Sequence, residues 1–200
     1  MCKKNLFKTM AIVSIIFASI YVVGKTFSIF TSKDSIVNKF TTADVTGEVV
    51  ENFPENEKDW EDPVIKEVKF KNTGTTDAVI RVNFLENWKQ YDEEEKYLSN
   101  IIDGEEVTNK IWTAEWSTEW TKGNDGWYYY NYILKPEEST KKVLEAVEFK
   151  EKFKEEYKDA DYNLTFNMEC VNADTEATKE VFGVESNYLG DGQVEWTINQ

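Results

Sequence analysis

The feature that most constrains the fold is a strict two-residue alternation near the end of the chain. In Tyr162–Cys170 the residues Tyr, Leu, Phe, Met and Cys occupy every second position, and polar residues fill the positions between them. Side chains of a β-strand point alternately to opposite faces, so this pattern predicts a strand with one buried and one solvated face. Such a strand needs a second layer of structure to cover its apolar face.

Similar segments occur along the chain, separated by polar loops. The expected strands are 45–53, 64–72, 78–85, 127–134, 143–149, 162–170 and 194–198. The Asn-Thr-Gly-Thr sequence that begins at Asn72 is a turn signal, and it predicts a hairpin between the second and third strands. Because no helix alternates regularly with these strands, the pattern predicts an all-β fold, an antiparallel β-sandwich.

Residues 86–126 have a different character, being polar, acidic and rich in tryptophan. We expect them to form an insertion between two core strands. Within it, Tyr91–Ile102 is predicted as a short helix. Short helical segments are also expected within Glu151–Asp159 and Ala173–Val181.

The first residues have the parts of a secretory signal peptide. Three lysines lie within the first eight positions, and residues 10–23 are apolar apart from two serines. Small residues then occupy the −3 and −1 positions of a cut between Ser28 and Ile29. The alternative is an uncleaved membrane anchor, but a spanning helix needs about 20 apolar residues, more than this run supplies.

The chain therefore divides into three parts. Residues 1–28 are the predicted signal peptide, 29–45 an N-terminal extension, and 46–200 the sandwich domain. The net charge is −15, and residues 1–28 hold four of the 23 basic residues and no acid. The remainder carries 19 basic against 38 acidic residues, a net −19. Such a surface repels phosphate backbones, so no nucleic-acid partner is expected.

The sequence contains no recognisable catalytic constellation. It has no histidine, which removes the commonest general base and the commonest metal ligand. It also has no HExxH sequence and no glycine-rich phosphate loop, and its acidic clusters do not match a calcium-binding loop. We therefore predict no enzyme activity, no cofactor and no metal site.

Two kinds of side chain remain as candidates. Cys170 is the one cysteine outside the signal segment, and its place on the apolar face of its strand predicts a buried, unreactive thiol. Four tryptophans form a candidate ligand platform, although the same rings could belong to the core. They are Trp112, Trp116, Trp120 and Trp127.

Several short motifs suggest a family. They are Gly24–Asp34, Asn38–Val45, Val68–Gly74, Ala78–Val82, Asp125–Tyr130 and Leu134–Pro136. In these motifs the chain resembles the camelysin/TasA-type, SipW-dependent biofilm matrix proteins, most closely the BsaA-like biofilm surface adhesins of Gram-positive clostridia. The resemblance covers nearly the whole chain. It implies a jelly-roll or immunoglobulin-like β-sandwich and cleavage by a SipW-type signal peptidase. It also implies secretion to the extracellular matrix or cell surface of a Gram-positive bacterium, with membrane contact only during export.

The resemblance also implies a mode of assembly. In TasA-type fibres the N-terminal segment of one subunit completes the sheet of the next, which is a form of strand addition. The expected function is a structural subunit of biofilm matrix fibres, with copies of itself and other matrix components as partners. Here the candidate donor residues are Ile29, Phe30, Ile36, Val37 and Phe40.

Two other functions remain open. One is a monomeric cell-surface module that binds carbohydrate or protein. The other is a metal-dependent protease, since camelysin has been classed as one, although this chain has no histidine to bind the metal.

Overall fold

The computed structural model describes residues 45–52, 63–91, 95–158 and 160–198. All of them belong to one unit, Asp34–Gln200. The predicted signal peptide, its cleavage site and the candidate donor residues lie outside the described residues.

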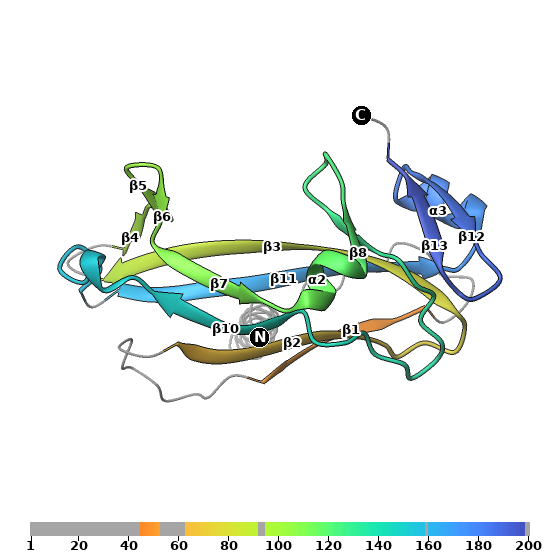
Figure 1. The fold of residues 1–200 in the computed structure, drawn as a ribbon, viewed down its shortest axis with the longest axis horizontal. Helices are drawn as coiled ribbons and strands as arrows, with labels where there is room; N and C mark the ends of the chain where they lie inside the picture. The colour runs from red at the N-terminus through yellow and green to blue at the C-terminus, as the bar shows by residue number, and fades with distance from the viewer. Residues whose placement is uncertain (1–44, 53–62, 92–94, 159, 199–200) are drawn as a thin grey trace, which may run out of the picture. The chain divides into compact units, whose positions relative to one another are not determined.

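The described residues form an antiparallel β-sandwich, which confirms the predicted fold class (Figure 1). Sheet I has the order β1 (Gly47–Asn52), β2 (Val64–Asn72), β10 (Leu144–Phe149) and β7 (Thr108–Trp112). Sheet II has the order β11 (Ala160–Asn172), β3 (Ala78–Tyr91), β9 (Tyr128–Tyr130) and β8 (Trp120–Lys122). A further strand, β4 (Glu95–Leu98), also pairs with β3.

Short hairpins and helices lie outside the two sheets of this sandwich. Two short hairpins are formed by β5 (Ile101–Ile102) with β6 (Glu105–Glu106), and by β12 (Glu185–Tyr188) with β13 (Val194–Thr197). The helical segments are α2 (Ala114–Thr118), the 3-10 helix η1 (Glu151–Phe153) and α3 (Thr175–Val181). Helix α3 confirms the prediction for residues 173–181, and the side chain of Asp174 caps it by accepting from two backbone N–H groups.

Among the described residues, the strand predicted from strict alternation takes part in the longest strand pairing. β11 pairs with β3 without interruption, from Ala160 opposite Gln90 to Asn172 opposite Ala78. The even-numbered side chains of β11 from Leu164 to Cys170 are buried in the main core between the sheets. Periodicity therefore located both the strand and its inward face.

Phe70 of β2 lies at the centre of the main core and is fully buried. Its ring packs edge-on against Trp120, at 5.5 Å between centroids, and against Phe166 of the opposite sheet, at 5.8 Å. A buried aromatic of this kind contributes about 1.5–3 kcal/mol through removal of its surface from water.

The predicted hairpin between residues 64–72 and 78–85 is wrong. β2 and β3 lie in different sheets, and the link between them carries the chain across the sandwich. Buried Asn72 fixes this crossing, because its amide donates to the carbonyls of Thr76 and Leu134, both at 2.9 Å, and accepts from the N–H of Gly74. The apolar sides of the two strands thus face each other across the core.

The predicted helix at residues 91–102 is also wrong. β3 continues to Tyr91, and the chain returns as β4, with Trp88 opposite Leu98. Trp88 is almost fully buried and extends the inward alternation of β3. The region 86–126 also supplies β7 to sheet I and β8 to sheet II, so much of it belongs to the sandwich itself.

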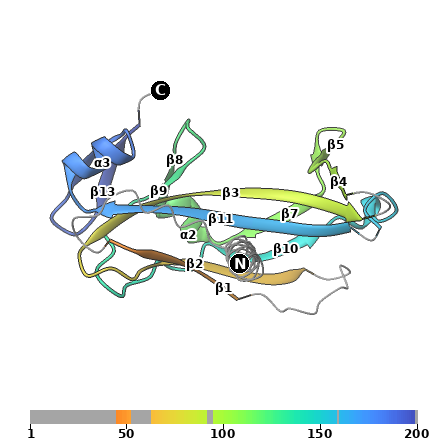
Figure 2. The same cartoon turned by 180° about the vertical axis from the view of Figure 1, so that it is seen from behind.

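The outer face of sheet II is covered at one end by a C-terminal module, residues 173–198. Figure 2 shows α3 and β13 over the end of β11. This module forms a second apolar cluster with the sheet, and it covers the outer side of the aromatic strand β9. The cluster contains Val79, Tyr129, Val171, Phe182, Val184 and Val194.

Candidate functional site

The free edge of β11 is the most prominent candidate for an interaction site. β11 is 13 residues long and stands at the end of the order of sheet II. Among the described residues, only β3 pairs with it. Its sequence contains no lysine and no proline, the residues that commonly protect edge strands from further pairing. An edge of this length is a template for strand addition.

Hydrogen bonds at the ends of the strand indicate which backbone groups point outward. The N–H of Ala173 donates to the carbonyl of Asp77, and Ala78 exchanges both of its bonds with Leu134 on the other side. Residues of odd number in β11 therefore bond to β3, because the direction alternates along an antiparallel strand. The even-numbered residues direct their N–H and C=O groups to the free edge. They are Tyr162, Leu164, Phe166, Met168 and Cys170.

The start of the described chain lies close to this edge. Gly47 of β1 lies against β11 so closely that a side chain on it would collide with that of Met168. Before it, the carbonyl of Thr46 accepts from the N–H groups of Thr73 at 2.8 Å and Gly74 at 3.1 Å. Buried Val45 joins the main core. The N-terminal extension therefore meets the sandwich at a fixed point.

Three of the four candidate tryptophans lie together, in or against the main core. Trp116 of α2 and Trp120 of β8 are buried in the main core, and half-buried Trp112 of β7 stacks on Trp116 at 4.8 Å between centroids. Trp112 ends β7 and Trp120 begins β8, on either side of the short helix α2. The Trp120 ring continues the row at 5.2 Å from that of Trp116. Trp127 lies apart from them, half-buried beside Arg81.

Cys170 is buried on the inward face of β11, as its position in the alternating pattern predicted. Burial raises the pKa of its thiol to about 11. The thiol therefore stays protonated near neutral pH, where it is a poor nucleophile. Within the described ranges, no group of three or more acidic or cysteine residues is arranged to hold a metal ion.

The role of Arg81, the only arginine in the chain, was not predicted from the sequence. It lies on the outer face of β3, where the guanidinium donates to the carboxylate of Glu169 at 2.9 and 2.7 Å and to the carbonyl of Phe182 at 2.9 Å. The guanidinium also lies 4.6 Å from the ring centre of Trp127. Arg81 thus fastens the C-terminal module to sheet II. The sequence did contain one indication of this role: the only arginine of the chain lies on the face of β3 opposite its apolar side chains.

The same cluster contains the phenol of Tyr129. Its O–H donates to the carboxylate of Asp125 at 2.7 Å. Burial, together with this hydrogen bond, raises the pKa of Tyr129 to about 12. The phenol therefore remains a neutral donor, and it holds the turn between β8 and β9 against the cluster.

The described part of the chain contains no helix that is both long and apolar enough to span a membrane. In comparisons with family models, curated proteins and solved structures, nothing matches this chain.

Proposed function

We propose that this chain is a secreted structural subunit of extracellular matrix fibres. Subunits polymerise when residues 29–45 of one copy add as a strand to the sandwich of the next. The observation that carries this proposal is the free edge of β11, paired on one side only among the described residues. The motifs that resemble TasA-type matrix proteins provide separate support.

The chemistry of the edge suits an added strand. The even-numbered residues of β11 offer outward backbone groups, and each backbone hydrogen bond gained contributes about 0.5–1.5 kcal/mol net. In an extended strand, Ile36 and Phe40 would point to the same face, because they are an even number of positions apart. The extension thus combines backbone pairing with an apolar face to bury, the usual basis of strand addition.

The attachment point of the extension allows two ways of pairing with a β11 edge. The link between β2 and β3 holds Thr46, the residue that follows the extension. The extension is therefore attached at a fixed position beside the end of β11. Pairing of the extension with the β11 edge of its own copy is the competing arrangement. The two differ in concentration dependence, since only donation between copies increases with protein concentration.

Electron microscopy of the mature chain, residues 29–200, tests the function directly. We expect fibres from this chain and none from the double variant Ile36→Asp/Phe40→Asp, because two charges cannot be buried at a strand interface. The matched control is Thr31→Asp/Ser32→Asp, which adds the same charge at polar positions of the extension. Fibres from the Ile36→Asp/Phe40→Asp variant would contradict strand donation.

Amide hydrogen exchange tests whether β11 accepts the strand. In the monomer, the amides of Leu164, Phe166 and Met168 should exchange faster than those of Thr165 and Asn167, which bond to β3. Assembly should slow the even-numbered amides specifically. Unchanged exchange at these amides in fibres would exclude the β11 edge as the acceptor.

A further inference from the structure

A pocket lies where the C-terminal hairpin meets the end of sheet II, separate from the β11 edge. Its cavity volume is about 340 Å³, within the range of pockets that hold small ligands. The lining comes from the end of α2, from β8, from the segment after β9 and from β13. The residues that matter chemically are Thr118, Thr121, Asn131, Tyr132, Gln193 and Trp196.

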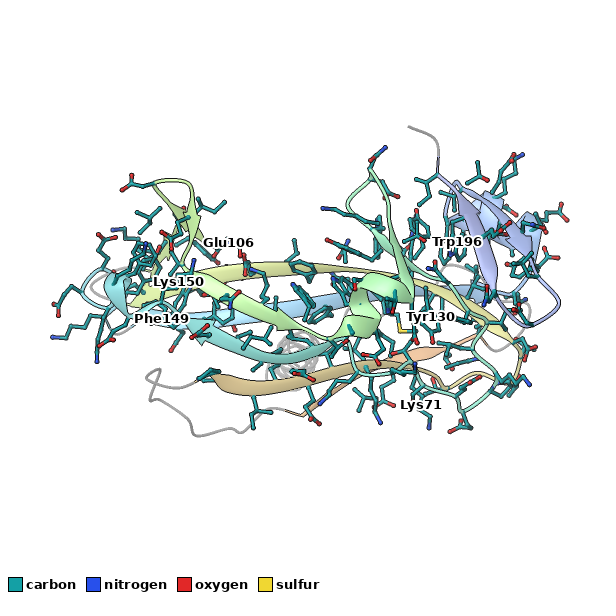
Figure 3. All side chains as sticks on the ribbon, in the orientation of Figure 1. Lys71, Glu106, Tyr130, Phe149, Lys150 and Trp196 are labelled. Atoms are coloured by element: carbon teal, nitrogen blue, oxygen red, sulfur yellow. The ribbon has the colours of Figure 1, made fainter. Side chains whose placement is uncertain are left out.

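The walls of the pocket are held in place by hydrogen bonds. The N–H of Val194 donates to the carbonyl of Asn131 at 2.9 Å, which ties β13 to the segment after β9. The indole N–H of Trp196 donates to the carbonyl of Tyr130 at 3.0 Å, and Figure 3 labels both residues. The hydroxyl of Thr121 donates to the side-chain carbonyl of Asn131 at 2.8 Å. A pocket ordered in advance loses less conformational entropy when a ligand binds.

The polar groups of the pocket include both donors and acceptors. With its carbonyl engaged by Thr121, Asn131 retains an amide N–H₂ that has no partner among the described residues. The same holds for the amide of Gln193 and the hydroxyl of Tyr132 within the described part of the chain. Tyr132 and Trp196, both half-buried, add aromatic surface. One side of Trp196 already packs on Tyr129, at 5.2 Å between centroids.

The charge of the pocket narrows the class of ligand. No lysine or arginine lines it, and Glu195 is the one charged residue in the lining. The Glu195 carboxylate is partly satisfied by the amide of Asn187 at 3.1 Å. The lining offers no cation to a phosphate or carboxylate ligand, and the net charge of −19 outside the predicted signal peptide would repel such a ligand. The remaining groups suit an uncharged ligand with many hydroxyl groups and apolar ring faces.

We propose that this pocket binds one unit of a neutral saccharide chain. Amide and threonine side chains hydrogen-bond the sugar hydroxyls, and Tyr132 and Trp196 contact the C–H face of the ring. This site is distinct from the row of rings that Trp112, Trp116 and Trp120 form in and against the main core. The inference does not depend on fibre formation, because all lining residues come from one copy of the chain.

Isothermal titration calorimetry of the mature chain tests the site. The probes are three neutral tetrasaccharides, cellotetraose, maltotetraose and tetra-N-acetylchitotetraose, at up to ~10 mM, which detects dissociation constants of about 1 mM or tighter. We expect saturable binding of at least one. Gln193→Ala should weaken it about three- to tenfold, the effect of one lost hydrogen bond, and Tyr132→Ala should weaken it at least as much.

Matched controls separate the pocket from general effects of substitution. Asn124→Ala removes an exposed amide from the turn between β8 and β9, and Tyr97→Ala removes an exposed aromatic from β4. Neither residue lines the pocket, so both variants should bind like the parent. Absence of binding for all three tetrasaccharides would overturn the proposal, as would binding that Gln193→Ala and Tyr132→Ala leave unchanged. Binding of tetramethylammonium with no sugar binding would also overturn it, in favour of a cation site.

Discussion

Replacing Arg81 by methionine is expected to lower the free energy of unfolding by about 3–5 kcal/mol. The magnitude follows from burial: Arg81 and Glu169 are each 9% exposed, and the guanidinium supplies two hydrogen bonds to one carboxylate oxygen. Methionine fills similar space beside Trp127 but donates nothing. The Glu169 carboxylate and the Phe182 carbonyl would both lose a donor while remaining covered by the C-terminal module.

Comparison with a double variant distinguishes an unpaired charge from simple loss of packing. We expect Arg81→Met/Glu169→Met to be more stable than Arg81→Met by at least about 2 kcal/mol, because replacing both members of a buried ion pair by apolar residues removes the unpaired charge. Urea unfolding of the mature chain at pH 7, followed by tryptophan fluorescence, measures these differences.

The matched control for these variants is Lys179→Met. Lys179 pairs with Glu185 at 3.0 Å, but both side chains are more than half exposed. Exposed pairs of this kind contribute little, so the change should cost about 0.5 kcal/mol or less. The reasoning is refuted if Arg81→Met costs less than about 1 kcal/mol, or if the double variant is as unstable as the single one.

Two further substitutions and one measurement of thiol reactivity test other parts of the fold. Phe70→Ala should cost about 3–5 kcal/mol in the same unfolding assay, because it empties the centre of the main core, and a cost below about 1.5 kcal/mol would contradict that position. Asn72→Ala should cost about 2–4 kcal/mol, since two carbonyls lose their donor at the crossing between sheets, and a neutral result would show that the crossing is held by other contacts. The thiol of Cys170, whose pKa burial raises from 9.0 to about 11, should react with a disulfide reagent at pH 8 far more slowly in the folded than in the urea-unfolded chain. Because the folded thiol stays neutral while the unfolded one ionises, this group's contribution to stability should be present below pH 9 and lost as the pH rises towards 11.

Strand positions were predictable wherever one face of a strand meets the core. In Tyr162–Cys170, alternation alone identified the residues that face the main core, and the structure agrees. It did not predict that Glu169, on the opposite face, would also be buried. Alternation does not state which strands pair, however. β2 and β3 present apolar faces whether they pair side by side or face each other across the core, and the bonds of Asn72 decide between these two arrangements.

The failed helix prediction has a different cause. Residues 92–96 are all charged, and a charged run gives no signal of strand pairing. Within the described residues, β4 is extended because it pairs with the long strand β3. The packing of the C-terminal module on sheet II could not be predicted either, because it depends on one arginine and on contacts between distant parts of the sequence. Such long-range contacts leave no local periodicity.

The two proposed sites lie at opposite edges of sheet II. β11 stands at one end of the strand order, whereas Thr121 of the pocket belongs to β8 at the other end. No residue lines both sites, and β3 and β9 separate them within the sheet. Addition of a strand to β11 would therefore leave the pocket open to solvent on every subunit. A fibre built in this way would carry one pocket per subunit along its length, so that weak binding of single sugar units would add up to strong attachment to a polysaccharide.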